Sequence, residues 1–202
     1  CDILYFPMNT EHRMFGVAEC FFMFGDEKLE QKARRLLRDA IRYRPEIIEL
    51  AEAAINCEVL GGKAYAAMHV RRGDFQCGET KIDARQIVEN TQSLLQSNQP
   101  VYLATDESDA DFVGVLRERF DLTTFNDLPG DIVAKVPHHW CGIIETLICA
   151  AAPGRFIGTR LSTFSARIAI LRGHLSFTKG GDCEAIDTTL YYNKLPLTES
   201  AT

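Results

Sequence analysis

The sequence predicts an α/β fold, namely a Rossmann-like parallel sheet with helices on both faces. Short apolar runs suited to buried strands alternate along the chain with segments whose apolar residues recur at helical spacing. Strands separated by helices in this rhythm are typical of a parallel sheet with right-handed crossovers. The run 64–70 is apolar enough to be buried on both faces, as a central parallel strand is.

The composition is that of an ordinary globular domain. The chain has 202 residues, enough for one domain with a full core, and 46% of them are hydrophobic and 25% charged. The net charge of −6 argues against nucleic acid as a partner, because nucleic-acid binding usually requires a basic face. No apolar run approaches the roughly eighteen residues of a membrane span, and none resembles a cleavable signal segment.

Seven cysteines leave at least one thiol unpaired if the others form disulfides, and no CxxC pair indicates a zinc or redox site. His138, His139 and Cys141 lie close together in the sequence, and a metal site is one interpretation of them. A fourth ligand at suitable spacing is missing, so we favour a polar loop followed by a buried thiol and expect no metal. Cys149 lies in an apolar segment and is expected in the core.

Two helices are expected before the central strand. Asp26 is a suitable N-cap for a helix that begins at Glu27, and Pro45 suits the first turn of a second helix, where a missing amide costs nothing. Gly61 and Gly62 end this helical unit. We therefore divide the chain into a connector with helices, the domain itself and a tail, with the bounds 1–60, 61–175 and 176–202.

Three further strands and four further helices are expected beyond residue 75. The strands are expected at 101–105, 122–125 and 155–158. The helices are expected at 83–95 with Asp83 as the cap, at 108–120 with Ser108 or Asp109 as the cap, at 140–152 and at 163–171. Loops are expected at 76–81 and 126–137, and the tail is expected to pack back on the body through Tyr191 and Tyr192.

The central strand ends in a cluster of polar residues, Arg71, Arg72, Gly73 and Asp74. Each guanidinium offers a planar fork of donors, the glycine lets the backbone come close to a ligand, and the acid can orient an arginine. One interpretation is therefore an anion site. The alternative is a strand end that carries a surface ion pair, which is an ordinary feature of proteins.

Two other strand ends carry complementary groups. Thr105 and Asp106 follow the second strand, where Asp106 either accepts from the N–H groups of a base or a ribose hydroxyl, or caps the next helix. Residues 162–165 form a hydroxyl-rich helix start that suits an anion, although an ordinary N-cap looks the same. Because parallel strands end at one edge of the sheet, these groups are expected to converge.

Together the three strand ends predict a site for a nucleoside diphosphate. Arginines and helix amides would bind the phosphates, and a carboxylate would bind the base or sugar. The chain lacks the G-x-G-x-x-G and G-K-S/T motifs and the spaced carboxylates that usually hold magnesium. The positive charge must then come from arginine.

Three segments, 69–75, 101–107 and 149–165, resemble the signature segments of GDP-fucose protein O-fucosyltransferases. The similarity is closer to the branch that modifies thrombospondin repeats, with its plant and algal relatives, than to the epidermal-growth-factor branch. The resemblance implies the donor-binding half of a GT-B glycosyltransferase. Such an enzyme is inverting and metal-independent, needs no cofactor, and transfers fucose from GDP-fucose to a protein Ser or Thr hydroxyl.

The resemblance also implies roles for individual residues. Arg71 would hold the β-phosphate and stabilise the leaving GDP, with Arg72 and Asp74 in support. His69 and Asp106, with Thr105, would help to place the guanosine. The diphosphate would be bound by hydroxyls and amides of Ser162, Thr163, Phe164 and Ser165.

In that family an amino-terminal domain supplies acceptor contacts and, in the thrombospondin-repeat branch, a glutamate base. We find no such domain in this sequence, and nothing supports Glu11 or Glu19 as the base, so we expect an incomplete enzyme whose protein acceptor is recognised elsewhere. The resemblance places such enzymes in the lumen of the endoplasmic reticulum or Golgi. Two alternatives are a non-catalytic nucleotide-sugar-binding module and an enzyme of the same shape with another donor.

Overall fold

The structure is a computed structural model that describes residues 26, 28, 29, 32, 43–75, 78, 81–178 and 190–192, with only the backbone described for 174–178, 190 and 191. The chain divides into two compact units, 1–42 and 43–202. In the first unit the Asp26 carboxylate accepts the backbone N–H groups of Lys28 and Leu29 at 2.9 and 3.2 Å, which confirms the predicted cap. The apolar patches before Asp26, and Glu11 and Glu19, lie outside the described residues.

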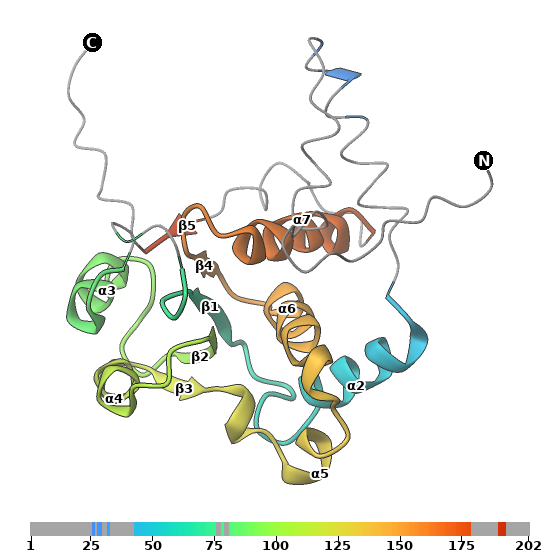
Figure 1. The fold of residues 1–202 in the computed structure, drawn as a ribbon, viewed down its shortest axis with the longest axis horizontal. Helices are drawn as coiled ribbons and strands as arrows, with labels where there is room; N and C mark the ends of the chain where they lie inside the picture. The colour runs from blue at the N-terminus through green and yellow to red at the C-terminus, as the bar shows by residue number, and fades with distance from the viewer. Residues whose placement is uncertain are drawn as a thin grey trace. The chain divides into compact units, whose positions relative to one another are not determined.

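The second unit contains a five-stranded parallel sheet in the order β3-β2-β1-β4-β5 (Figure 1). Its strands are β1 Ala66–Val70, β2 Pro100–Thr105, β3 Asp121–Thr123, β4 Phe156–Gly158 and β5 Leu190–Tyr191. The predicted central strand is indeed central, because β1 pairs with both β2 and β4. It begins at Ala66, two residues later than expected, and β5 was not predicted.

Helices cover both faces of the sheet (Figure 1). The longer helices are α2 Pro45–Ile55, α3 Ala84–Thr91, α4 Ala110–Arg119, α6 Cys141–Ala151 and α7 Thr163–Thr178. Three short elements lie between α4 and α6, namely η3 Phe125–Asp127, α5 Gly130–Val133 and η4 His138–Trp140. Helices α3 and α4 pack on one face, and α2, α6 and α7 lie on the other.

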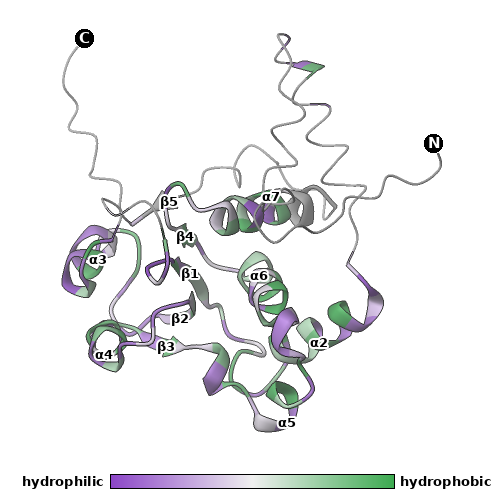
Figure 2. Cartoon of the chain, in the orientation of Figure 1, coloured by the Kyte–Doolittle hydropathy of each residue, from purple (hydrophilic) through white to green (hydrophobic). Residues whose placement is uncertain are grey.

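Strand β1 shows how one segment supports two cores. Ala66, Met68 and Val70 pack in the cluster formed with α3 and α4, whereas Ala67 belongs to the cluster formed with α2 and α6. Successive side chains of a strand point to opposite faces, so a strand whose residues are all buried, as in β1, serves both layers. Helix α6 is correspondingly apolar, while α3 and α4 also carry polar residues (Figure 2). The predicted α/β fold class is confirmed.

Several predicted boundaries were wrong. The helix expected over 83–95 ends at Thr91, because the chain then turns through Asn98, whose φ is 56°. The apolar periodicity that suggested a longer helix is real, since Leu95 is buried, but Leu95 lies in the turn. Asp109, not Ser108, caps α4, and its carboxylate accepts the backbone N–H groups of Asp111 and Phe112.

Two other boundaries differ in the second half of the chain. The segment expected as a loop over 126–137 contains α5. The last helix was expected to end near Gly173 but continues to Thr178. A single glycine costs a helix only about 1 kcal/mol, which its neighbours can offset.

Candidate active site

The three predicted strand ends meet at the carboxyl edge of the sheet. Val70, the last residue of β1, pairs with Thr105, the last of β2, and Met68 pairs with Ile157 of β4. Hydrogen bonds then join the residues that follow. Arg71 donates to Asp106 after β2, and its backbone N–H donates to the Thr159 hydroxyl after β4 at 2.9 Å. The predicted convergence is therefore present.

Arg71 is held between two carboxylates. Its guanidinium donates through one terminal nitrogen to Asp106 and through the other to Asp74. The side chain keeps 24% of its exposure, so the arginine is accessible at the edge of the sheet. A guanidinium fixed by two acids presents its planar fork in a defined orientation, which suits recognition of an oxyanion.

Arg72 is used differently from its neighbour. Its Nε donates to Glu107 at 2.9 Å, a terminal nitrogen donates to the backbone carbonyl of Ile82, and its guanidinium lies over the Phe112 ring at 4.4 Å. These contacts place Arg72 on the side of α3 and α4. Its backbone N–H donates to Asp106 at 2.8 Å, so Arg72 helps to hold the carboxylate that orients Arg71.

The turn after β1 leaves room only for glycine. A Cβ added at Gly73 would overlap the Asp106 carboxylate. That carboxylate is already held by Arg71 and by the Arg72 amide, so it has little freedom to move aside. The backbone therefore passes close to Asp106, whereas the sequence analysis expected this glycine to let the backbone approach a ligand.

Thr159 directly follows β4 and is hydrogen-bonded to the end of β1 and to the start of α7. Its hydroxyl donates to the His69 carbonyl at 2.9 Å and accepts the Arg71 N–H, and its own N–H donates to the Ser165 hydroxyl at 2.9 Å. Thr159 is fully buried. Sequence reasoning did not single out Thr159 as a site residue, although its hydrogen bonds join the end of β1 to the start of α7.

His69 points from β1 to the face that carries α6 and α7. Its Nδ1 lies 2.7 Å from the Ser165 Oγ, and its ring stacks on Phe164 with centroids 4.4 Å apart. Burial, with a smaller effect of the nearby Arg71 charge, lowers the pKa of His69 to about 3, so the ring is neutral at neutral pH. Ser165 Oγ accepts the Thr159 N–H and can either donate to Nδ1 or accept from it, so this contact fixes the orientation of the ring.

The remaining predicted residues divide into buried and accessible ones. Ser165 is 1% exposed and serves His69 and Thr159, whereas Thr163 is exposed at the first turn of α7. Thr105 is used within the protein, because its hydroxyl donates to the Val70 carbonyl at 2.7 Å and accepts the Glu107 N–H at 3.0 Å. Ser162 is buried immediately before α7.

A comparison with protein-family models identifies the family of the chain. The model described as GDP-fucose protein O-fucosyltransferase matches residues 4–175. The chain belongs to this family. Family membership indicates a glycosyltransferase of the fucosyltransferase type with GDP-fucose as the donor. A search of curated proteins found no match.

Sequence reasoning also missed one buried titratable residue of this O-fucosyltransferase-family chain. Glu145 is the charged residue of the otherwise uncharged helix α6, and it lies partly buried beside Tyr102. Burial raises the pKa of Glu145 to about 7. A side-chain interaction with the buried Tyr102 hydroxyl opposes part of this rise. An acid in an apolar helix was the available sequence signal.

Glu145 lies on the same face of the sheet as His69. One turn earlier in α6, a Cβ added at Gly142 would lie 3.5 Å from the Phe164 ring that stacks on His69. The start of α6 therefore borders the histidine-phenylalanine pair. Burial of its carboxyl group in this layer explains the raised pKa of Glu145.

Neither a metal cluster nor a membrane span is present in the described part of the chain. No three His, Cys, Asp or Glu side chains within it are grouped so that they could hold a metal ion, and this includes the vicinity of His138, His139 and Cys141. No helix within it is long and apolar enough to cross a membrane. Cys149 is buried, as predicted.

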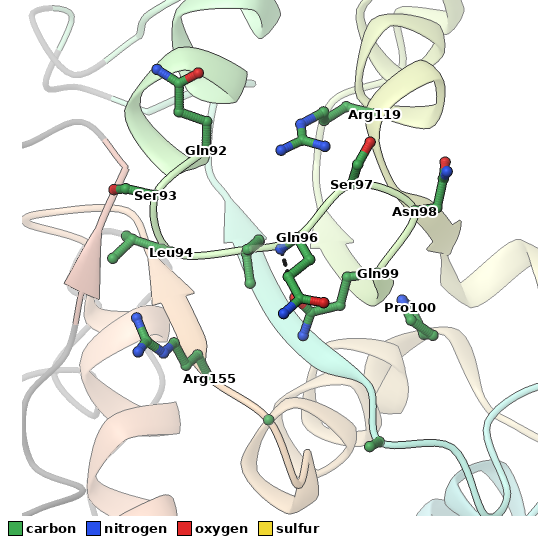
Figure 3. Close-up of a pocket in the computed structure, with 13 residues that line it drawn as sticks. Gln92, Ser93, Leu94, Gln96, Ser97, Asn98, Gln99, Pro100, Arg119 and Arg155 are labelled. Atoms are coloured by element: carbon green, nitrogen blue, oxygen red, sulfur yellow. Dashed lines mark hydrogen bonds between the residues drawn. The ribbon is translucent and has the colours of Figure 1, made fainter.

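A hollow lies at the opposite, amino edge of the sheet (Figure 3). It has a volume of about 860 Å³, and the turn 92–100 lines it together with Arg119 and Arg155. Helices α3 and α4 end beside it, and an arginine near a helix carboxyl end is favoured by the helix dipole. None of residues 71–74 lines this hollow, so it is separate from the strand-end site.

Proposed function

We propose that this chain binds GDP-fucose at the carboxyl edge of the sheet and is the donor-binding part of an inverting protein O-fucosyltransferase. The observation that supports it most is the guanidinium of Arg71, held by Asp74 and Asp106 at the end of the central strand. This arrangement offers a fixed cation where ligands of parallel α/β sheets bind.

The chemistry requires stabilisation of the departing diphosphate. As the bond between fucose C1 and the β-phosphate oxygen breaks, its electron pair stays on that oxygen, and negative charge grows there. The hydroxyl oxygen of a Ser or Thr acceptor bonds to C1 from the opposite face and loses its proton to a base. Arg71 would stabilise the growing charge more strongly than the charge of the bound donor, which lowers the barrier.

Groups around Arg71 would position the rest of GDP. The neutral ring of His69 stacks on Phe164, and this pair would place the guanosine. The hydroxyls of Ser162 and Thr163 and the amides of Thr163 and Phe164 would bind the diphosphate at the positive end of α7, since the Ser162 amide already donates to the Thr159 carbonyl at 3.2 Å. Ser165 would contribute by holding His69.

Asp106, Asp74 and Arg72 would act mainly on Arg71. Asp106 accepts from the Arg71 guanidinium and from the Arg72 amide, so its carboxylate is engaged within the protein. These contacts support a role for Asp106 in orienting the guanidinium of Arg71. The positive charge for the diphosphate would come from arginine, so the proposal requires no metal ion and no cofactor. The acceptor would be a protein in the lumen of the endoplasmic reticulum or Golgi.

Calorimetric titration of the chain with GDP tests this proposal. We expect GDP to bind and Arg71→Ala to weaken binding by about tenfold or more, because a charge-assisted bidentate contact is lost. Arg85→Ala, on the exposed side of α3, is the matched control and should leave the affinity unchanged. No binding of GDP, equal affinity for GDP, UDP and ADP, or unchanged affinity in Arg71→Ala would contradict the proposal.

A further inference from the structure

Tyr192 joins the end of the chain to the strand-end site. It follows β5 directly, its N–H donates to the Gly158 carbonyl at 3.3 Å, and its carbonyl accepts from the Asn90 side chain at 2.7 Å. The side chain is 1% exposed and packs in the core cluster formed with α3 and α4. The tail residue expected to pack back on the body therefore does so, at the ends of β1 and β4.

The hydroxyl of Tyr192 completes the hydrogen bonds of Thr159. The two hydroxyl oxygens lie 3.0 Å apart. Thr159 has one hydroxyl proton, and it is donated to the His69 carbonyl, which can only accept. Tyr192 must then be the donor to Thr159, whose oxygen also accepts the N–H of Arg71.

This network fixes the main chain of Arg71. We propose that Tyr192 is a positioning residue for Arg71, acting through the Thr159 hydroxyl on the backbone from which the guanidinium extends. The inference rests on the proposed function, because it concerns the residue assigned to the β-phosphate. When a group contacts the reacting atoms, a small displacement of that group is enough to weaken the contact strongly.

Removal of the hydroxyl alone would test the network. Tyr192→Phe keeps the ring that packs in the core but leaves the buried Thr159 oxygen without one donor. A buried polar atom that loses its partner is costly, so the strand ends are expected to shift to recover a hydrogen bond. The effect should appear where Arg71 acts, at the β-phosphate.

The chain offers a matched control. Tyr65 is also buried, at 2% exposure, and its hydroxyl donates to the Ile148 carbonyl at 3.0 Å. Tyr65 lies before the start of β1, at the other end of this strand from Arg71. Tyr65→Phe removes the same atom from an equally buried tyrosine. A general effect of losing a buried hydroxyl would appear in both variants.

Calorimetric titration with GDP and with GMP separates positioning from stability, because GMP lacks the β-phosphate. We expect Tyr192→Phe to weaken GDP binding by about tenfold and to change GMP binding by less than about twofold. Tyr65→Phe should leave the ratio of the two affinities unchanged. Asn90→Ala removes only the hydrogen bond to the Tyr192 carbonyl. It should lower the ratio of GDP affinity to GMP affinity by a smaller factor, about threefold.

The outcomes distinguish the two proposals. If the wild-type chain binds neither nucleotide, the proposed function fails. If it prefers GDP and Tyr192→Phe retains that preference, or loses affinity for both nucleotides in parallel, the positioning role is overturned. If Tyr192→Phe does not fold, an unchanged affinity ratio in a folded Asn90→Ala overturns it.

Discussion

At the scale of single residues, the orientation of Arg71 matters as much as its charge. Its guanidinium bonds Asp74 and Asp106 at the same time, through different terminal nitrogens. A lysine ammonium is a compact point charge on a flexible stem and lacks this planar fork. The site therefore depends on a guanidinium at this position and not merely on a cation.

We predict that Arg71→Lys loses most of the GDP affinity although it preserves the net charge. The loss should be about tenfold, comparable with Arg71→Ala, because the two carboxylates no longer hold the cation in place. Calorimetric titration with GDP at fixed ionic strength measures it, with Arg85→Lys as the control. Affinity close to wild type in Arg71→Lys would show that charge alone is sufficient.

Two buried titratable groups predict an unusual dependence of stability on pH. The pKa of Glu145 is raised to about 7 by burial, so its contribution to stability is full below the ordinary value of 4.5 and is lost as pH rises to about 7. The pKa of His69 is lowered to about 3, so its contribution is full above 6.5 and is lost as pH falls towards 3. The two trends oppose each other between 4.5 and 6.5.

Glu145→Gln should therefore change the pH profile in a defined direction. Without Glu145, the free energy of unfolding should rise with pH between 4.5 and 6.5, because the His69 contribution is no longer opposed. Urea unfolding of both proteins from pH 4.5 to 8 gives the two profiles. A constant difference between the profiles across this range would show that Glu145 titrates normally.

The sequence predicted that the three strand ends converge, but not the contacts that each side chain makes there. Arg71 and Arg72 are adjacent and chemically identical, and only the structure shows that one bonds Asp74 while the other lies over Phe112. Such a difference is set by contacts with α4, which are distant in sequence. Glu145 was missed for the same reason, because its burial depends on the packing of α6 against other elements.

At the scale of elements, the turn before α7 is strained. Leu161 has a φ of 67° and is 56% exposed, and it lies immediately before Ser162. A leucine in the left-handed region costs roughly 1–2 kcal/mol, and such residues tend to persist where function fixes the backbone. The strain sits in the segment that leads from Thr159 to the proposed diphosphate contacts.

We predict that Leu161→Gly stabilises the protein by about 1 kcal/mol, since glycine adopts this φ freely and the greater entropy of its unfolded chain offsets part of the gain. Leu161→Ala keeps the strain and should give no gain. Thermal and urea unfolding of the three proteins measure the difference. Equal stability of the glycine and alanine variants would mean that the turn is not strained.

The type of each element was predictable because the local periodicity and the caps agree with the tertiary structure. Asp83 and Asp109, for example, cap α3 and α4. Element ends were less predictable. Helix α3 ends at Thr91 although the apolar pattern of its sequence continues beyond this residue. Helix α7 continues past Gly173, where a glycine suggested an end. In both places packing against other elements outweighs the local preference, and a single sequence does not display that packing.

At the scale of the whole molecule, the fold could be predicted because a run such as 64–70 requires two covered faces. That requirement leads to a central parallel strand with helices on each side, and from there to a site at the carboxyl edge. Strand β5 could not be predicted, because two residues carry no periodicity. Its pairing with β4 depends on a contact between distant parts of the chain.

Binding of GDP should stabilise the whole described domain, because the site is assembled from three strand ends that exist together only in the folded state. A ligand that binds only the folded state adds about 2.7 kcal/mol at one hundred times its Kd. For a domain of this size, that corresponds to a rise in Tm of roughly 5–11 °C. UDP at the same concentration should give a smaller shift.

The same measurement with EDTA tests the source of the positive charge. Arg71 supplies the cation in the proposed site, and the described residues hold no group of ligands suited to a metal ion. The shift in Tm caused by GDP should therefore be the same with EDTA as with Mg²⁺, and it should be lost in Arg71→Ala. If the shift required Mg²⁺ and survived the loss of Arg71, the diphosphate would be neutralised by a metal ion and the role assigned to this arginine would be wrong.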